Sequence, residues 1–253
     1  MEQKIKKQEL SDTQNQITEG VIWKQLLLFF FPILFGTFFQ QLYYTVDAIV
    51  VGQFVGKEAL AAVGGPTGTL INLLVGFFVG LSSGATVIIS QFYGARREDK
   101  VSFAVHTSVA FSLLCGLGIM AVGILGAPIA LAAMGTPDDI LEYAILYMRL
   151  YFLGTIPNLI YNMGAGVLRA AGDSRRPLLF LITGCVTNIV LDVILVVFLH
   201  MGVAGAALAT IFSQAASALF VVVVLTRIRE MYRLTFSLIR LDRRMLNRII
   251  RIG

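Results

Sequence analysis

Long apolar runs separated by short polar connections dominate this sequence. At a rise of about 1.5 Å per helical residue, a run of some 20 residues crosses the roughly 30 Å of hydrocarbon in a bilayer. Six runs meet this requirement, and they cover residues 26–51, 66–92, 103–126, 140–168, 177–199 and 203–226. The connections carry turn and cap residues. Thr136 and Pro137, followed by two acidic residues, predict the start of the fourth helix.

The composition favours a membrane protein over a soluble one. Hydrophobic residues make up 57% of the 253 positions, charged residues only 14%, and the mean hydropathy is +0.81. Such a chain lacks the polar residues that would cover a water-facing surface. The two cysteines, Cys115 and Cys185, lie in apolar runs, which argues against a disulfide scaffold. We therefore predict an all-α integral membrane protein with six transmembrane helices.

The positions of the lysines and arginines predict how the chain is oriented. All but two of the 20 basic residues flank the runs on one face, and the exceptions are Lys57 and Arg149. Because basic residues are retained on the cytoplasmic side, we expect a multi-pass protein of the plasma (cytoplasmic) membrane with both termini in the cytosol. Membrane topology thus accounts for the net charge of +5, and no nucleic-acid partner is expected.

The predicted helices divide the chain into three parts. Residues 1–20 form a polar cytosolic segment, residues 21–228 form the transmembrane lobe, and residues 229–253 form a basic cytosolic linker. From about Phe236 to Ile252 the linker alternates Leu, Ile and Met with Arg at helical spacing. This pattern is typical of an amphipathic helix that lies on the cytosolic leaflet.

Four polar side chains interrupt the apolar runs at positions where burial is unfavourable: Asp47, Asn188, Asp192 and Thr210. Counted from the outer ends of their helices, Asp47, Asp192 and Thr210 lie at similar depths, roughly 12 to 15 Å below the outer surface. Asn188 and Asp192 are four residues apart, so they share one face of the fifth helix. The pattern predicts that these side chains form one cluster.

Two carboxylates in a medium of low dielectric constant resist being charged together. Either one of them binds a proton or a cation lies between them, and hard cations prefer the oxygen ligands that this cluster supplies. We therefore predict a site for Na⁺ or H⁺ at the four residues. The alternative is that each aspartate is capped or paired separately, with Arg149 as one candidate partner.

Four short motifs follow one another in a specific order. They are Pro32 with Gln40-Gln41-Leu42 and Val46-Asp47, the segment 168–177 (LRAAGDSRRP), the segment 188–192 (NIVLD), and the segment 202–210 (GVAGAALAT). From about residue 20 to its end, the chain resembles the multidrug and toxic compound extrusion (MATE) family of secondary transporters. The resemblance implies two six-helix lobes that open alternately to the two sides of the membrane.

The resemblance also implies a function, which is export of organic cations or similar amphipathic compounds in exchange for Na⁺ or H⁺. In this family, an Asp, an Asn, an Asp and a Thr form the cation site of the first lobe, and they correspond here to Asp47, Asn188, Asp192 and Thr210. Family members are nearly twice as long. The chain therefore resembles the N-terminal lobe and the start of the linker, and a second six-helix lobe is the expected partner.

Other residues of the first span are expected to serve transport. Pro32 removes a backbone N–H and should bend the helix. We expect Gln40, Gln41 and Tyr43 to line the substrate cavity. Neither an enzymatic activity nor a resident cofactor is expected.

Two other functions stay open. A flippase for lipid-linked oligosaccharides has a related architecture, and it would place basic residues inside the cavity, for which Arg149 is the one candidate. An intramembrane aspartyl protease could use Asp47 and Asp192. Such enzymes need a Gly-x-Gly-Asp type of sequence, whereas residues 189–192 read Ile-Val-Leu-Asp.

Overall fold

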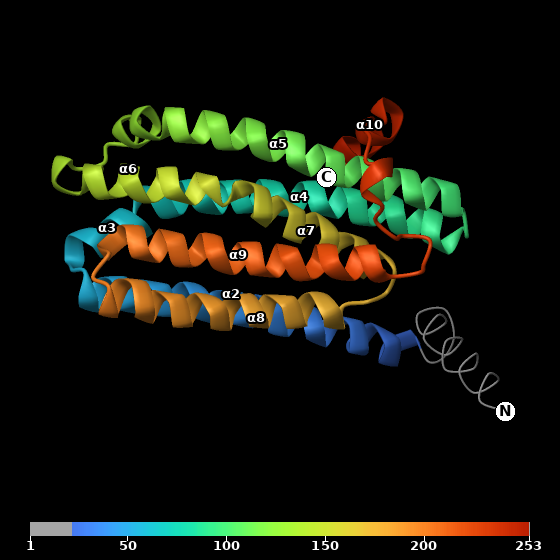
Figure 1. Ribbon diagram of the computed structural model, residues 1–253, viewed down its shortest axis with the longest axis horizontal. Coiled ribbons are helices and arrows are strands. Elements are labelled where there is room, and N and C mark those ends of the chain that lie inside the picture. The colour runs from blue at the N-terminus through green and yellow to red at the C-terminus, as the bar shows by residue number, and fades with distance from the viewer. Residues whose placement is uncertain (1–21, 253) are drawn as a thin grey trace.

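The computed structural model describes residues 22–252, and they form a bundle of helices without strands (Figure 1). The segment 1–20 assigned to the cytosol lies outside the described residues. The helices are α2 (Ile22–Phe54), α3 (Lys57–Gly64), α4 (Pro66–Gly94), α5 (Glu98–Ala133), α6 (Asp138–Leu153), α7 (Thr155–Ala170), α8 (Arg175–Asp192), the π-helical η1 (Val193–Phe198), α9 (Gly202–Arg227), the 3-10 turn η2 (Phe236–Leu238) and α10 (Arg243–Ile252).

The predicted all-α membrane fold is confirmed. Within residues 22–252, four stretches are long and apolar enough to cross a membrane, namely Lys57–Gly94, Glu98–Ala133, Arg175–Phe198 and Gly202–Arg227. The 33-residue α2 and the consecutive α6 and α7 run beside them over a similar length (Figure 1). Together they make a lobe of six membrane-length rods, and the helix ends lie within a few residues of those predicted for most spans.

The fourth predicted span, 140–168, is not one helix. α6 ends at Leu153 and α7 begins at Thr155, so that Gly154 interrupts the rod. A Cβ atom at Gly154 would lie 2.9 Å from Oε1 of Gln214 and 3.2 Å from Cγ1 of Ile211, so α9 passes close to the break. The break allows α6 and α7 to pack separately against α9.

The connection between α5 and α6 also differs from the expectation. The hydroxyl of Thr136 donates a hydrogen bond to the carbonyl of Leu131, at 2.7 Å, and α6 starts at Asp138 after Pro137. Thr136 therefore terminates the preceding helix rather than capping the next one. The short helix α3, in the predicted outer connection, was not predicted either.

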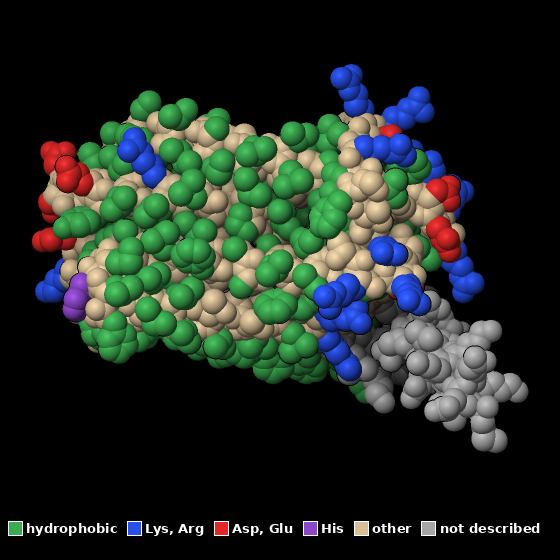
Figure 2. Space-filling view, in the orientation of Figure 1, with side chains coloured by type: hydrophobic (Ala, Val, Ile, Leu, Met, Phe, Trp, Pro, Cys, Tyr) green, Lys and Arg blue, Asp and Glu red, His purple; other side chains and the backbone are tan. Residues whose placement is uncertain are grey.

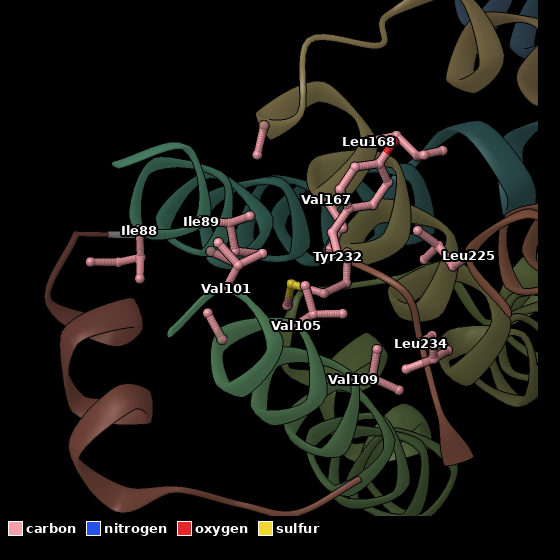
Figure 3. Packing of buried hydrophobic residues seen from close by; sticks show 14 of the residues in the cluster. Ile88, Ile89, Val101, Val105, Val109, Val167, Leu168, Leu225, Tyr232 and Leu234 are labelled. Atoms are coloured by element: carbon pink, nitrogen blue, oxygen red, sulfur yellow. The ribbon is translucent and has the colours of Figure 1, made fainter. Parts of the chain in front are cut away.

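Buried apolar side chains form two clusters, one toward each end of the bundle. The first joins α4, α5, α7 and α9 to the chain after α9, and Figure 3 shows Tyr232 and Leu234 packed among Val105, Leu168 and Leu225. The second joins α2, α3, α5, α6 and α9. The cores are thus concentrated toward the two ends of the six-helix lobe.

Charged side chains gather at the two ends of the bundle, and a broad apolar band separates them (Figure 2). Lys and Arg predominate at the end that holds the α4–α5 connection, the α7–α8 connection and the chain after α9 (Figures 1 and 2). We call this the basic end. The band is what a lipid-facing surface requires, because hydrocarbon offers no partner for charge.

Residues 228–252, which we call the strap, are bound to the basic end. The backbone N–H of Thr235 donates to Nε2 of His106 at 3.0 Å, and the guanidinium of Arg240 lies 4.4 Å from the ring centre of Phe103. Burial raises the pKa of Tyr232 to about 12, so its phenol stays neutral at physiological pH.

The strap corrects the expected amphipathic helix. The segment from Phe236 is helical only in η2 and α10, and α10 packs Met245 and Ile249 against α4 and α5. Met245 and Ile249 of this helix are therefore buried against the protein, whereas Ile250 and Ile252 are about half exposed. Its position on the leaflet stays a prediction.

Candidate functional site

The four polar residues predicted at membrane depth come from helices that pack side by side. Asp47 lies on α2, Asn188 and Asp192 on α8, and Thr210 on α9, and α8 contacts both of the other helices. Their exposed fractions are 5% for Asp47, 0% for Asn188 and Asp192, and 1% for Thr210. All four side chains are thus excluded from solvent, including two carboxyl groups.

The geometry links α2 to α9 at this cluster. The hydroxyl of Tyr43, one helical turn before Asp47, donates to Oγ1 of Thr210 at 3.0 Å. The hydroxyl of Thr210 donates in turn to the carbonyl of Ala206 at 3.1 Å. Asp47 and Asp192 are near enough for their charges to interact, and Tyr147 of α6 is near both. We call Tyr43, Asp47, Asn188, Asp192 and Thr210 the carboxylate cluster.

Several polar atoms of this cluster have no protein partner. Oδ1 of Asp47, both carboxyl oxygens of Asp192 and both polar side-chain atoms of Asn188 lack a hydrogen bond within the described part of the chain. Buried polar atoms are almost always paired, because desolvation without a partner is unfavourable. Their donor set of carboxylate and amide oxygens fits a hard cation or protons.

Arg149 is not a partner of either aspartate. Its side chain is exposed, and its Nε donates to the carbonyl of Ile124 on α5 at 3.3 Å. The alternative in which Arg149 neutralises an aspartate is therefore wrong.

A cavity of about 440 Å³ lies beside the carboxylate cluster, between α2, α4, α7, α8 and α9. Pro32, Gln40 and Tyr43 lie in its wall, whereas Gln41 lies in a separate shallow hollow beside α3. Tyr43 thus borders the cavity and also bonds to Thr210 of the cluster. It is the side chain that the cavity wall and the carboxylate cluster share.

Several polar residues of the cavity wall were missed by the sequence reasoning. Asn158, Asn162 and Arg169 of α7 line it, together with Gln214 of α9. The signal was present, because residues 158, 162 and 169 recur at helical spacing on one face. The long apolar run around these residues obscures the polar stripe.

Pro32 lies inside α2, which continues from Ile22 to Phe54. Proline donates no backbone hydrogen bond, so the helix is locally weakened beside the cavity. The bending of this helix stays a prediction.

Comparison with known proteins places the chain in a family. The MatE family profile matches residues 32–194. The chain belongs to the MatE family. It is 29% identical over 239 residues to the probable multidrug resistance protein YoeA of Bacillus subtilis (strain 168), a match that covers 92% of this chain and 51% of YoeA. It is 33% identical over 205 residues to the probable multidrug resistance protein YpnP of the same organism, covering 80% of this chain and 45% of YpnP.

The fold comparison agrees. A MOP superfamily transporter from Pyrococcus furiosus Vc1 (DSM3638) is 31% identical, with a TM-score of 0.87 over 95% of this chain and 53% of that one. The chain therefore spans about half the length of the relatives it matches. The names of these relatives are those of probable multidrug resistance proteins and a transporter, so they lend no support to a catalytic use of the two aspartates.

Proposed function

We propose that this chain is one lobe of a secondary multidrug exporter that exchanges Na⁺ or H⁺ for an amphipathic small molecule. The observation that carries the proposal is the carboxylate cluster, in which the buried side chains of Asp47, Asn188 and Asp192 present polar atoms without protein partners. An ion or proton that satisfies these atoms supplies the coupling free energy that an exchanger needs.

Coupling would run through Tyr43. Ion binding at Asp47 and Asp192 would change the field around the Tyr43–Thr210 hydrogen bond, and Tyr43 forms part of the cavity wall. The ion would thereby favour one shape of the cavity and the substrate another, by their different affinities for the two shapes. Pro32, in the same wall, is where α2 would bend.

The orientation follows from charge. We place the basic end in the cytosol, in the plasma membrane, because lysines and arginines are retained on that side. The cavity reaches this end through Arg169 and Ser174. Substrate would then enter from the cytosol or from the inner leaflet. The relatives are about twice as long as this chain, which leaves room for a second six-helix lobe. We propose that such a lobe is the partner that completes the cavity.

The cargo expected from the family resemblance is an organic cation, which the ring faces of Phe39, Tyr43 and Tyr44 in the cavity wall could bind. The second candidate function, a flippase for an anionic headgroup, is favoured by one observation. A basic side chain, that of Arg169, lines the cavity. Binding assays with a cationic and an anionic amphipathic compound distinguish the two functions.

The test of the ion site uses the protein's single tryptophan. Trp23 lies in the first turn of α2, so its fluorescence reports on the helix that carries Asp47. In the purified full chain in lipid nanodiscs, we expect Na⁺ titration, or a change from pH 8 to pH 5 in the absence of Na⁺, to change this fluorescence. Asp192→Asn and Asp47→Asn should weaken the response at least about tenfold, because each removes one ligand charge.

Asp138→Asn is the matched control. Asp138 is an exposed carboxyl in the first turn of α6, and its replacement should leave the response unchanged. An ion and pH response that survives in Asp192→Asn and Asp47→Asn would refute the ion site.

A further inference from the structure

We propose that Arg169 is an anion-binding residue of the cavity, so that the preferred substrates are amphipathic compounds with a carboxylate or phosphate group. The inference rests on the proposed export function and specifies its substrate class. It starts from the charge of the cavity. Arg169 is the only ionised side chain among the described residues that line the cavity, and no carboxylate lines it there.

Arg169 lies at the end of a row of polar residues in the cavity wall. It lies in the last turn of α7, on the helix face that also carries Asn158 and Asn162, and all three residues line the cavity. This face forms a polar stripe that starts near the middle of the bundle and ends with a guanidinium at the basic end. A ligand in the cavity meets amide groups along the stripe and a positive charge at its end.

No carboxylate within the described residues neutralises Arg169. The nearest acidic residue along the chain, Asp173, binds elsewhere: its Oδ2 lies 3.2 Å from Nε of Arg176, and its Oδ1 accepts the backbone N–H groups of Arg175 and Arg176 at 3.1 Å each. The electrostatic neighbour of Arg169 is the phenol of Tyr161. A half-buried guanidinium without a counter-charge gains strongly from an anion.

The rest of the wall fits the apolar body of such a compound. Phe39, Leu178 and Leu181 supply apolar contacts, Gln214 supplies hydrogen bonds, and the volume of about 440 Å³ is that of a site for a drug-sized molecule. The planar guanidinium matches the two oxygens of a carboxylate or phosphate. A positive group on the same substrate would face the aromatic rings.

The experiment compares two dyes that differ in one charge. The probes are a xanthene dye with a free carboxylate and the methyl ester of the same dye, and their binding to the full chain in nanodiscs of neutral phospholipid is followed by fluorescence anisotropy. We expect the acid to bind at least about tenfold more tightly than the ester. Arg169→Gln should abolish this preference, and Arg169→Lys should retain part of it. Arg175→Gln, which removes an exposed charge of the same end outside the cavity, should leave the preference intact.

Three results would overturn the proposal. The first is equal binding of acid and ester by the unchanged protein, and the second is a preference that survives Arg169→Gln. The third is an Arg169→Gln variant whose affinity for both dyes falls by the same factor and which unfolds at a lower temperature, because Arg169 would then act only on the carboxyl end of α7. If only the ion-site hypothesis is wrong, Trp23 fluorescence will not change with Na⁺ or pH, and the preference for the acid dye will persist.

A further arm identifies the source of the anion. If nanodiscs of anionic phospholipid weaken binding of the acid dye to the unchanged protein, but not to Arg169→Gln, a lipid headgroup is a natural ligand of Arg169. If the lipid has no such effect, the ligand is a water-soluble amphipathic anion. Either result supports the anion site.

Discussion

Five side-chain atoms of the carboxylate cluster lack hydrogen-bond partners within residues 22–252. An equal number of unpaired polar atoms in an ordinary core would be strongly destabilising, since each costs about 1 to 3 kcal/mol. Their concentration on Asp47, Asn188 and Asp192 is therefore informative about function. Thr210, by contrast, is fully paired through Tyr43 and Ala206 and helps hold α2 against α9.

Tyr43→Phe should show whether the hydroxyl of Tyr43, rather than the size of its ring, couples the two sites. The variant keeps the ring but removes the hydroxyl that donates to Thr210. We expect a loss of about 1 kcal/mol in stability and a several-fold change in the Na⁺ affinity reported by Trp23, because the field at the cluster changes. Thermal unfolding and Na⁺ titration measure the two effects. Tyr143→Phe, at an exposed tyrosine of α6, is the control, and identical behaviour of both variants would contradict the coupling role.

Where helices meet closely, small residues decide the fit. A Cβ atom at Gly123 of α5 would overlap the ring of Phe152 of α6, a side chain that is itself buried. On the same helix, a Cβ atom at Gly118 would meet nothing within 4 Å. The two glycines look alike in the sequence, and only the contact with α6 distinguishes them.

Gly123→Ala should therefore destabilise the lobe by about 1 to 3 kcal/mol, because the ring of Phe152 or the α5 backbone must move. Gly118→Ala should be neutral or slightly stabilising, since alanine is the better helix former. Thermal unfolding in detergent compares the two variants. Equal melting temperatures for both would show that α5 and α6 do not approach as described.

A histidine of α5 accepts a hydrogen bond from the strap. Nε2 of His106 accepts the N–H of Thr235, and Nδ1 lies 2.7 Å from the carbonyl of Ser102, so the ring is held at both nitrogens. This pairing requires the neutral ring with its proton on Nδ1.

His106→Ala should loosen the strap, because Thr235 loses its acceptor and a buried ring is removed. We expect faster amide hydrogen exchange and faster trypsin cleavage at the arginines of residues 228–244. His200, the other histidine, is exposed near the opposite end, and His200→Ala should change neither rate. Unchanged exchange in His106→Ala would mean that the apolar contacts of the strap suffice to hold it.

On the face shown in Figure 2, the lobe has an apolar band in its middle, and charged side chains lie at both ends of the band. α2 contributes large exposed side chains to this band, with Phe30, Phe35 and Phe38 each about half exposed or more. Lipid or the proposed second lobe would cover this face. The cavity borders the same helix, as an interface between two lobes would require.

Cysteine labelling can test the orientation. In a chain whose Cys115 and Cys185 are replaced by alanine, we expect Lys57→Cys to react with a membrane-impermeant maleimide added to intact cells. Arg97→Cys should react only after the cells are permeabilised, since it lies at the basic end. The reverse pattern would overturn the proposed orientation.

The sequence by itself determined the helical membrane class, the extents of most helices and the buried polar residues of the carboxylate cluster. This was possible because transfer of an apolar segment into hydrocarbon, and the cost of polar groups there, depend on local composition. The tertiary structure decided the break at Gly154, the packing of α10 against α4 and α5, and the position of Arg169 in the cavity wall. These features depend on which helix faces meet, and contacts between residues far apart in the chain leave no local pattern to read.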